Sequence, residues 1–359
     1  MTRRLYSAIG LAIAFGFVVA APQLVLVRLK ADPTAAPADA AAPADALPSR
    51  LSDRDFWRLS VDSSEMDGYF RSDNLTSNEL LYQRVVPTLV RRVRASGVYL
   101  GVGPEQNFTY MAALKPPMAI IFDIRRGNML VQLMYKALFE LSKSRADFVS
   151  MLFSRPRPPG LGSDTSAADL FSAFRTIPAD EALLHRNLDA IKERLTKTHG
   201  FVLSPRDLDG VDYAYRSFFT RGYAVRYSPT YEDLMVQTDN DGVPRSYLAT
   251  EASFAFLKEL ESKNLVVPVV GDFGGPKAIR AIGSYLKAHD ATVSAFYLSN
   301  VEQYLYQDNK WAAFCKNVAT LPVDATSAFI RTMSGRGVGF GVGFVTSLGT
   351  IATEVRECQ

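Results

Sequence analysis

The sequence predicts an α/β fold with a doubly wound, mostly parallel sheet and a helical insertion after the second strand. Two short apolar runs, VYLGVG at 98–103 and MAIIFD at 118–123, are rich in β-branched and aromatic residues and have the composition of strands buried on both faces. Two further runs of this kind, VVPVVGD and TVSAFYLS, flank a helical segment within residues 264–305. Strands that alternate with helices favour parallel pairing through helical crossovers.

The amino terminus predicts a targeting segment rather than a part of this fold. Arg3 and Arg4 precede an uncharged apolar run at 5–20, which resumes after Pro22 and reaches about the 20 residues that a membrane span requires. We therefore interpret residues 1–29 as a signal peptide or a membrane anchor. An uncleaved anchor is favoured, because Pro22 is close to the candidate cleavage site, and the flanking charges weakly favour a cytoplasmic amino terminus.

Residues 30–50 form an Ala-, Pro- and Asp-rich linker, which has too few large apolar residues to build a core. The α/β domain is expected at residues 51–359. With the amino terminus inside, this domain lies outside the cytoplasm, either anchored to the membrane or exported. The topology stays open, because positive charge flanks both ends of the apolar run.

Helices are expected on both sides of the first strand. Residues 76–96 open with Thr76 and Glu79, the spacing of a capping box, and carry apolar residues at helical intervals. A second helix is expected to start at Pro104, where the missing amide hydrogen costs nothing. A third covers residues 128–142, directly after the second strand.

Residues 154–226 are expected to form the insertion. The segment 154–166 is rich in proline and glycine and predicts a loop, whereas residues 167–226 have a mainly helical pattern. An aromatic cluster in this part comprises Tyr213, Tyr215, Phe218 and Phe219. Core packing explains this cluster more simply than the lining of a substrate pocket.

Composition argues against several classes of function. The 40 Lys and Arg residues nearly balance the 37 Asp and Glu residues, so the net charge of +3 gives no electrostatic basis for a nucleic-acid partner. The three histidines and two cysteines form none of the spacings that hold a metal, and no metal site is expected. Without a GxSxG or a GxxxxGK[ST] motif, hydrolase and kinase assignments have no support.

The turn after the first strand, LGVGPEQN, is the strongest functional signal. Gly101 and Gly103 would let the backbone approach a ligand, and Asp123 follows Gly103 by 20 residues, which is the spacing of a ribose-binding carboxylate. The third glycine of a dinucleotide fingerprint is replaced by Gln106, and Glu105 would repel phosphate from the helix start. The turn therefore favours a different cofactor. The alternative is that the glycines only turn the chain and Asp123 caps the next helix.

LGVGPEQN followed by IIFDIRRGN resembles the first two motifs of class I S-adenosylmethionine-dependent methyltransferases, over residues 76–143. The resemblance implies a Rossmann-like domain in which the glycine turn contacts the methionine part of S-adenosylmethionine and the acid after the second strand holds the ribose hydroxyls. The implied cofactor-binding residues are Gly101, Gly103, Glu105, Asn107 and Asp123. Glu105 departs from the family pattern, which has a glycine there. The chain is also similar to a bacterial family of unassigned activity with this domain behind an amino-terminal anchor or signal. This resemblance implies that the domain belongs to the bacterial envelope, either anchored to the inner membrane or exported to the periplasm.

The strand-helix-strand unit at 264–305 supplies the candidate catalytic residues. Asp272 follows one strand, and Tyr297 and Asn300 lie at the end of the next. If the two strands are adjacent, Asp272 and Asn300 meet at the carboxyl edge of the sheet, where open α/β sheets bind ligands. Asp272 could act there as a base or could only accept hydrogen bonds from loop amides. The glycine loop after the first of these strands opens at the same edge.

Two functions follow from these observations. The first is methyl transfer from S-adenosylmethionine to an unknown acceptor, in which the cofactor carries the chemistry. The second is a non-catalytic exported or membrane-tethered protein that uses the fold to bind a small molecule or a partner protein. An anchor with its amino terminus inside favours the second, because S-adenosylmethionine is not expected outside the cytoplasm.

A nicotinamide-dependent dehydrogenase is disfavoured. Tyr306 and Lys310 fit the pattern YxxxK, and GVYLGVG fits GxxxGxG. However, Gly97 precedes the strand instead of following it, so the glycines have the wrong position for a cofactor turn.

Overall fold

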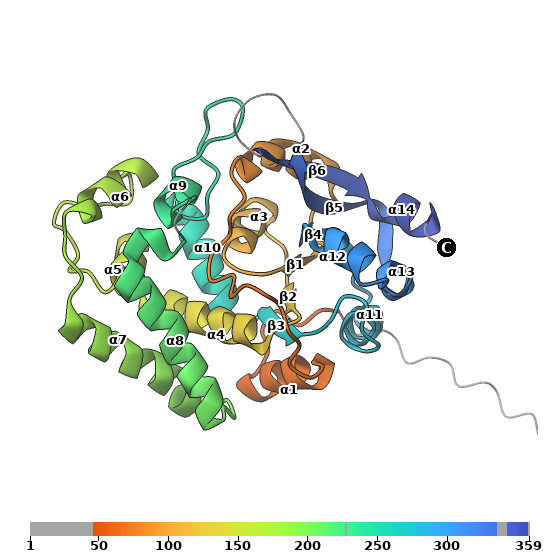
Figure 1. Cartoon of the computed structure of the whole chain (residues 1–359), viewed down its shortest axis with the longest axis horizontal. Coiled ribbons are helices and arrows are strands. Elements are labelled where there is room, and N and C mark those ends of the chain that lie inside the picture. Colours follow the sequence, from red (N-terminus) through yellow and green to blue (C-terminus); the bar gives the residue numbers. More distant parts are fainter. Residues whose placement is uncertain (1–45, 227, 336–342, 358–359) are drawn as a thin grey trace, which may run out of the picture. The chain divides into compact units, whose positions relative to one another are not determined.

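The computed structural model describes residues 46–226, 228–335 and 343–357. In this part of the chain six strands form one sheet in the order β3-β2-β1-β4-β5-β6. The strands are β1 Val98–Val102, β2 Ala119–Asp123, β3 Val266–Val270, β4 Val293–Ser299, β5 Val323–Gly335 and β6 Gly343–Thr350. Strands β1 to β5 are parallel, and β6 pairs antiparallel with β5. The predicted α/β class with a mostly parallel sheet is therefore confirmed (Figure 1).

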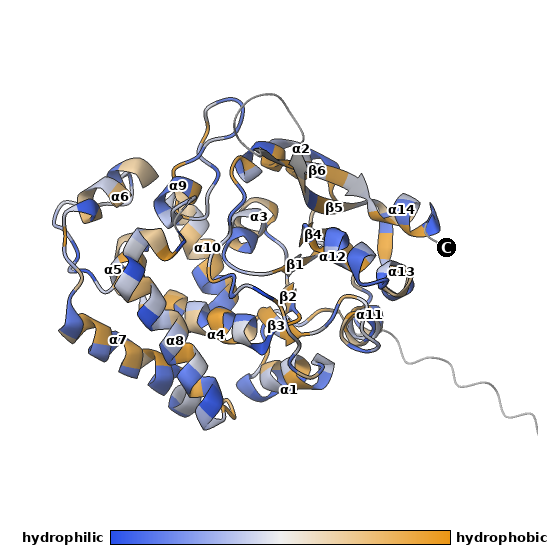
Figure 2. Cartoon of the chain, viewed as in Figure 1, coloured by the Kyte–Doolittle hydropathy of each residue, from blue (hydrophilic) through white to orange (hydrophobic). Residues whose placement is uncertain are grey.

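The central strands form because their sequences are apolar along nearly their whole length. Every residue of β1, β2 and β3 is buried, so both faces of this part of the sheet are covered. Strand β1 lies between β2 and β4, with Tyr99 opposite both Ala119 and Ala295. Figure 2 shows hydrophobic colours on β2 and β3, whereas helix α7 (Glu181–Glu193) alternates between hydrophobic and hydrophilic residues.

Helices pack on both sides of the sheet (Figure 1). On one side α3 (Gln106–Leu114) contacts β1, α4 (Arg126–Leu141) contacts β2 and β3, and α10 (Glu251–Ser262) packs on both helices. On the other side α11 (Ala278–Ala288) contacts α1 (Asp53–Ser63) and α13. The other helices near the sheet are α2 Val86–Arg92, α12 Val301–Gln307, α13 Trp311–Val318 and α14 Ile351–Glu357.

The connection from β2 to β3 is largely helical and lies where the sequence predicts the insertion. Between α4 and α10 it contains α5 Arg145–Phe153, α6 Ala167–Arg175, α7, the π-helix Arg194–Thr198, α8 Pro205–Arg221, the 3-10 helix Gly222–Val225 and α9 Tyr231–Met235. The proline- and glycine-rich residues 155–166 join α5 to α6 without helix or strand. Tyr215 and Phe218 of α8 are fully buried, which supports core packing for these two members of the aromatic cluster, whereas Tyr213 is 50% exposed.

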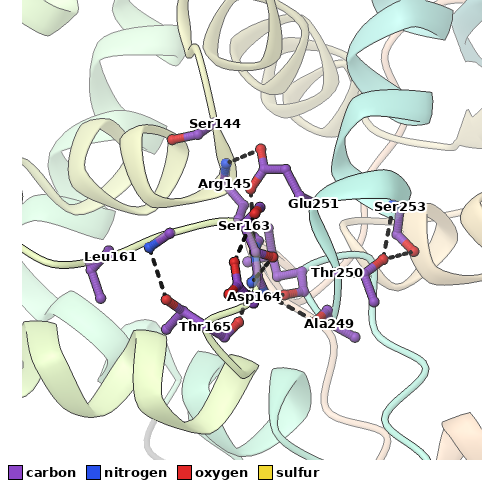
Figure 3. Close-up of polar contacts among 12 residues, drawn as sticks. Ser144, Arg145, Leu161, Ser163, Asp164, Thr165, Ala249, Thr250, Glu251 and Ser253 are labelled. Carbon is purple, nitrogen blue, oxygen red and sulfur yellow. Dashed lines mark hydrogen bonds and ion pairs between the residues drawn. The ribbon is translucent and has the colours of Figure 1, made fainter.

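Arg145, the first residue of α5, connects three segments of this helical part (Figure 3). Its side chain is only 2% exposed. The guanidinium donates hydrogen bonds to the carbonyls of Leu248 and Ala249, at 2.9 Å each, and to that of Ser163 at 3.0 Å. It also forms an ion pair with Glu251 at 3.4 Å. The side chain therefore joins the start of α5 to the loop before α6 and to the segment before α10.

A cluster of charged side chains holds α1 against α4. Lys136 pairs with Glu140 at 2.8 Å, Glu140 contacts Nε2 of His199 at 2.7 Å, and Nδ1 of His199 contacts Asp53 at 2.7 Å. Burial lowers the pKa of His199, but hydrogen bonds and charges from Glu140 and Asp53 outweigh burial and raise it. The cluster fixes the position of α1, and after α1 the chain continues across the carboxyl edge of the sheet.

The helix expected at 76–96 is shorter and begins later. Residues 76–81 form no helix, a 3-10 turn follows at Tyr82–Val85, and α2 begins at Val86. Leu81 has a φ of +68°, a left-handed conformation that a continuous α-helix does not contain. The predicted capping box of Thr76 and Glu79 is therefore wrong.

Helix α3 begins at Gln106, two residues after the predicted start at Pro104.

The predicted signal or anchor, residues 1–29, and most of the linker at 30–50 lie outside the described residues. None of the helices in the described ranges combines the length and the apolar character needed to cross a membrane.

Candidate functional site

A pocket of about 480 Å³ opens at the carboxyl ends of the parallel strands. Its lining includes Gly103 after β1, Asp123 at the end of β2, Asp272 after β3 and Ser299 at the end of β4. The chain order reverses here, because β2 and β3 lie on one side of β1 while β4 and β5 lie on the other. Open α/β sheets bind ligands at such a reversal, where the loops diverge. The pocket therefore occupies the position at which this sheet can bind a ligand.

The two glycines of the turn after β1 have different surroundings. Gly101 is buried inside the strand, and a Cβ at this position would lie 1.9 Å from Oδ1 of Asn107. Gly103 lines the pocket with a φ of +76°, and a Cβ there would have no atom within 4 Å. Gly101 is thus required by packing. At Gly103 the space beside the Cα is open, whereas the amide donates to the carbonyl of Phe122 at 3.3 Å and the carbonyl accepts from Nε2 of Gln132 at 2.9 Å. A ligand would therefore meet the bare Cα of Gly103 and not a free backbone amide.

Asn107 and Glu105 are buried under the turn and are not part of the pocket lining. Nδ2 of Asn107 donates to the carbonyls of Val102 at 2.8 Å and Pro104 at 2.7 Å, so it fixes the shape of the turn. The carboxylate of Glu105 accepts a hydrogen bond from the amide of Ser77 at 3.0 Å. Burial raises the pKa of Glu105 to about 7. The resemblance implies cofactor contacts for both residues, but the structure places them in support of the turn.

Asp123 closes β2 and lines the pocket at 6% exposure. Its Oδ1 accepts a hydrogen bond from the amide of Arg125 at 2.9 Å. Within the described ranges Oδ2 accepts no hydrogen bond, so this oxygen is available to a ligand hydroxyl. Burial raises the pKa of Asp123 to about 6.

Asp272, Tyr297 and Asn300 all line the pocket. However, β2 and β1 separate β3 from β4, so the expectation that Asp272 and Asn300 lie at the ends of adjacent strands is wrong. Asp272 forms an ion pair with Lys310, and this hydrogen bond raises the pKa of Lys310. Burial raises the pKa of Tyr297 well above its usual value. Neither Asp272 nor Tyr297 is placed as an unpaired base.

The glycine loop after β3 is occupied by a side chain of the protein itself. The carboxylate of Glu65 accepts hydrogen bonds from the backbone amides of Lys277 at 2.8 Å, Ala278 at 2.9 Å and Asp272 at 3.2 Å. A Cβ on Gly275 would lie 2.2 Å from Oε2 of Glu65. An internal anion therefore fills the amino-terminal end of α11, where a ligand anion would otherwise be favoured.

The chain matches the family described as Domain of unknown function (DUF7790) over residues 75–157 and 204–349. The chain belongs to this family. The matched ranges of the DUF7790 domain contain the strand ends that form the pocket, whereas residues 158–203, which carry α6 and α7, lie outside them. No curated protein matches the chain.

The segment 64–81 of the chain crosses the carboxyl edge of the sheet and completes the pocket of the DUF7790 domain. The amide of Glu65 donates to the carbonyl of Val270, and the amide of Gly68 to that of Ile124, both at 2.8 Å. A Cβ on Gly68 would lie 2.4 Å from the side chain of Ile124, so only glycine allows this approach. These contacts bring the later part of the segment over the ends of β1 and β4.

Glu79 enters the pocket lining through this segment. Its side chain accepts hydrogen bonds from Nε2 of Gln106 at 2.8 Å, from Oγ1 of Thr332 at 2.5 Å and from Oγ of Ser299. The spacing of Glu79 from Thr76 is typical of a helix cap and predicts that role from the sequence. The actual partners lie 27, 220 and 253 residues away along the chain, and a local pattern contains no signal for them.

The cationic side chains that line the pocket have other partners or none. Arg71 donates to the hydroxyl of Tyr304 at 2.9 Å and lies 5.3 Å from the centre of its ring, and Lys310 is paired with Asp272. Arg226 forms no hydrogen bond or ion pair within the described part of the chain, although its charge lowers the pKa of Glu105 against the effect of burial. None of these cations forms an ion pair with Glu79 in the described structure.

Proposed function

We propose that the pocket binds S-adenosylmethionine and that the domain is a methyltransferase-like, Rossmann-like module with an unknown acceptor. The observation that carries the proposal is that Gly103 and Asp123 line one pocket at the reversal of the strand order. A glycine turn after the first strand and an acid after the second are the two features that a nucleoside cofactor requires at this position.

The sheet supports the Rossmann-like part of the proposal. The order β3-β2-β1-β4-β5 with all five strands parallel places two strands on each side of β1. Helices pack on both sides of the sheet, as a doubly wound arrangement requires.

In this proposal the residues of the chain bind the cofactor and the acceptor and orient them. The bare Cα of Gly103 lets the cofactor approach the turn, and Oδ2 of Asp123 accepts hydrogen bonds from the ribose hydroxyls. Asp272, Tyr297 and Asn300 face the acceptor across the remaining pocket. When bound, the cofactor supplies an electrophilic methyl group. Because Asp272 is paired with Lys310, we expect the acceptor to be a group that is nucleophilic without help from a base.

Calorimetric titration of the full-length chain, purified in detergent, with S-adenosylmethionine and S-adenosylhomocysteine tests the proposal. We expect micromolar binding of at least one ligand and a loss of about tenfold or more in the Asp123→Asn variant, which keeps the shape but removes the charge. Asp308 also lines the pocket, and Asp308→Asn is the matched control with an expected change below about threefold. Absence of heat with both ligands on a folded sample would remove the proposal.

The same titration as a function of pH tests the role of the Asp123 charge. The pKa of Asp123 is about 6, so its carboxylate is ionised above this pH and protonated below it. We expect affinity to be constant from pH 7 to 8 and to fall about tenfold per pH unit below pH 6, since a protonated carboxyl loses acceptor capacity. The profile should be flat between pH 5 and 6 in Asp123→Asn. A wild-type profile that is also flat there would contradict the role.

The alternative is a non-catalytic protein of the envelope, exported or membrane-tethered, that binds a small molecule or a partner protein. The ion pair of Asp272 with Lys310 and the raised pKa of Tyr297 favour this alternative, because they leave the acceptor side of the pocket without an unpaired base. A reporter fused to the carboxyl terminus decides the side of the membrane. A cytoplasmic reporter supports catalysis, whereas a periplasmic one supports the binding protein.

A further inference from the structure

We propose that Glu79 is the counter-charge for a positively charged group of the ligand, which makes the β4 side of the pocket a cation subsite. The inference deepens the proposed function and rests on it for the choice of ligand. Nothing in the glycine turn or in Asp123 requires such a charge.

The carboxylate of Glu79 is buried among neutral groups. Glu79 is 2% exposed, and its three hydrogen-bond donors, Gln106, Thr332 and Ser299, are all neutral. A buried carboxylate is costly unless a positive charge compensates it, and neutral donors compensate it only in part. Arg71 and Lys310 are already paired elsewhere in the lining, and Arg226 forms no ion pair in the described structure.

The carboxylate of Glu79 is held in place by several elements of the fold. Its donors come from α3, from the end of β4 and from β5, so three separate elements hold one side chain in place. A charge that only needed hydration would be satisfied at the surface. Here the fold instead holds the charge at the wall of a cavity, which is the arrangement of a preorganised binding group.

Glu79 and Asp123 lie on opposite sides of the glycine turn. Asp123 ends β2, whereas Glu79 is bound between Ser299 at the end of β4 and Thr332 of β5, and the turn with Gly103 lies between Asp123 and Glu79. The separation from β2 to β4 is two inter-strand spacings, or about 10 Å. A ligand that spans the turn would place hydroxyl groups at Asp123 and a positive charge at Glu79. S-adenosylmethionine carries both kinds of group, with its charges on the sulfonium and the amino group.

The test compares S-adenosylmethionine with 5′-methylthioadenosine, which has the same nucleoside but no positive charge. In the full-length wild-type chain at pH 8 we expect S-adenosylmethionine to bind at least about tenfold more tightly. In Glu79→Gln this preference should disappear, with the affinity for 5′-methylthioadenosine changed by less than about threefold. S-adenosylhomocysteine, which keeps the amino group and lacks the sulfonium, then shows which of the two charges Glu79 meets.

Two further variants keep the test decisive. Glu105→Gln is the matched control, because Glu105 is also a buried carboxylate near Gln106 but does not line the pocket, and it should retain the preference. If Glu79→Gln does not fold, the comparison is made with Ser299→Ala. That change removes one of the three donors that hold the carboxylate in place, so the preference for the charged ligand should fall.

The outcomes separate the two proposals. If neither nucleoside binds to folded wild type, the proposed function and the cation subsite both fail. If both bind and Glu79→Gln weakens them equally or not at all, the cation subsite fails while the proposed function stands. A preference that is unchanged in Ser299→Ala, or one that is lost in the Glu105→Gln control, would also contradict the role of Glu79.

Discussion

Replacing Arg145 with alanine is expected to lower the free energy of unfolding by about 3–5 kcal/mol, because it removes one partner from a buried, charged hydrogen-bond cluster. The side chain is 2% exposed and donates to the carbonyls of Leu248, Ala249 and Ser163. Without it these carbonyls lose a charged donor, and Glu251 loses its cation (Figure 3). Urea unfolding of the full-length chain, followed by the fluorescence of Trp57 and Trp311, measures the change.

Two comparisons identify the cause of this loss. Arg145→Lys keeps a positive charge for Glu251 but lacks the planar fork that serves several carbonyls at once, so we expect about half of the alanine effect. Arg58 pairs with Asp55 at 3.0 Å at the surface, and Arg58→Ala should cost less than about 1 kcal/mol. A cost below 1 kcal/mol for Arg145→Ala would mean that the three segments are held by apolar packing alone.

The fold could be predicted to a large extent because its strands are defined locally. The runs at 98–102, 119–123 and 266–270 are apolar throughout and become the buried strands β1, β2 and β3. The order of the strands could not be predicted in the same way. The pairing of β1 with β4 depends on contacts between residues about 195 positions apart, and a local pattern does not contain this information.

The candidate site could be predicted where its residues lie in the last part of a strand or directly after it. Gly103, Asp123 and Asp272 reach the pocket for this reason. Glu79 and Glu65 belong to the segment that crosses the edge of the sheet, and their partners lie in distant strands and loops. The resemblance implies cofactor binding for Asn107 because this residue belongs to the glycine turn, but a sequence pattern cannot distinguish a side chain that contacts a ligand from one that holds the turn.

Asn107→Ala is expected to lower the free energy of unfolding by about 2–4 kcal/mol, since it leaves several buried polar groups without partners. Nδ2 of Asn107 donates to the carbonyls of Val102 at 2.8 Å, Pro104 at 2.7 Å and Gly103 at 3.3 Å. Its Oδ1 accepts a hydrogen bond from the buried hydroxyl of Tyr99 at 2.9 Å. The same urea unfolding measurement, made without any ligand, gives the change.

The contrast with Asn300 decides whether Asn107 shapes the turn or contacts a ligand. Asn300 lines the pocket, and its side chain is engaged only by the hydroxyl of Ser299 at 3.4 Å in the described structure. Asn300→Ala should therefore change stability by less than about 0.5 kcal/mol. If Asn107→Ala instead unfolds like the wild type and loses only affinity for S-adenosylmethionine, Asn107 contacts the ligand and the turn is held by Gly103 and the strand itself. Loss of stability without ligand, with binding retained below the unfolding transition, would establish that Asn107 builds the turn on which the binding of any ligand at Gly103 depends.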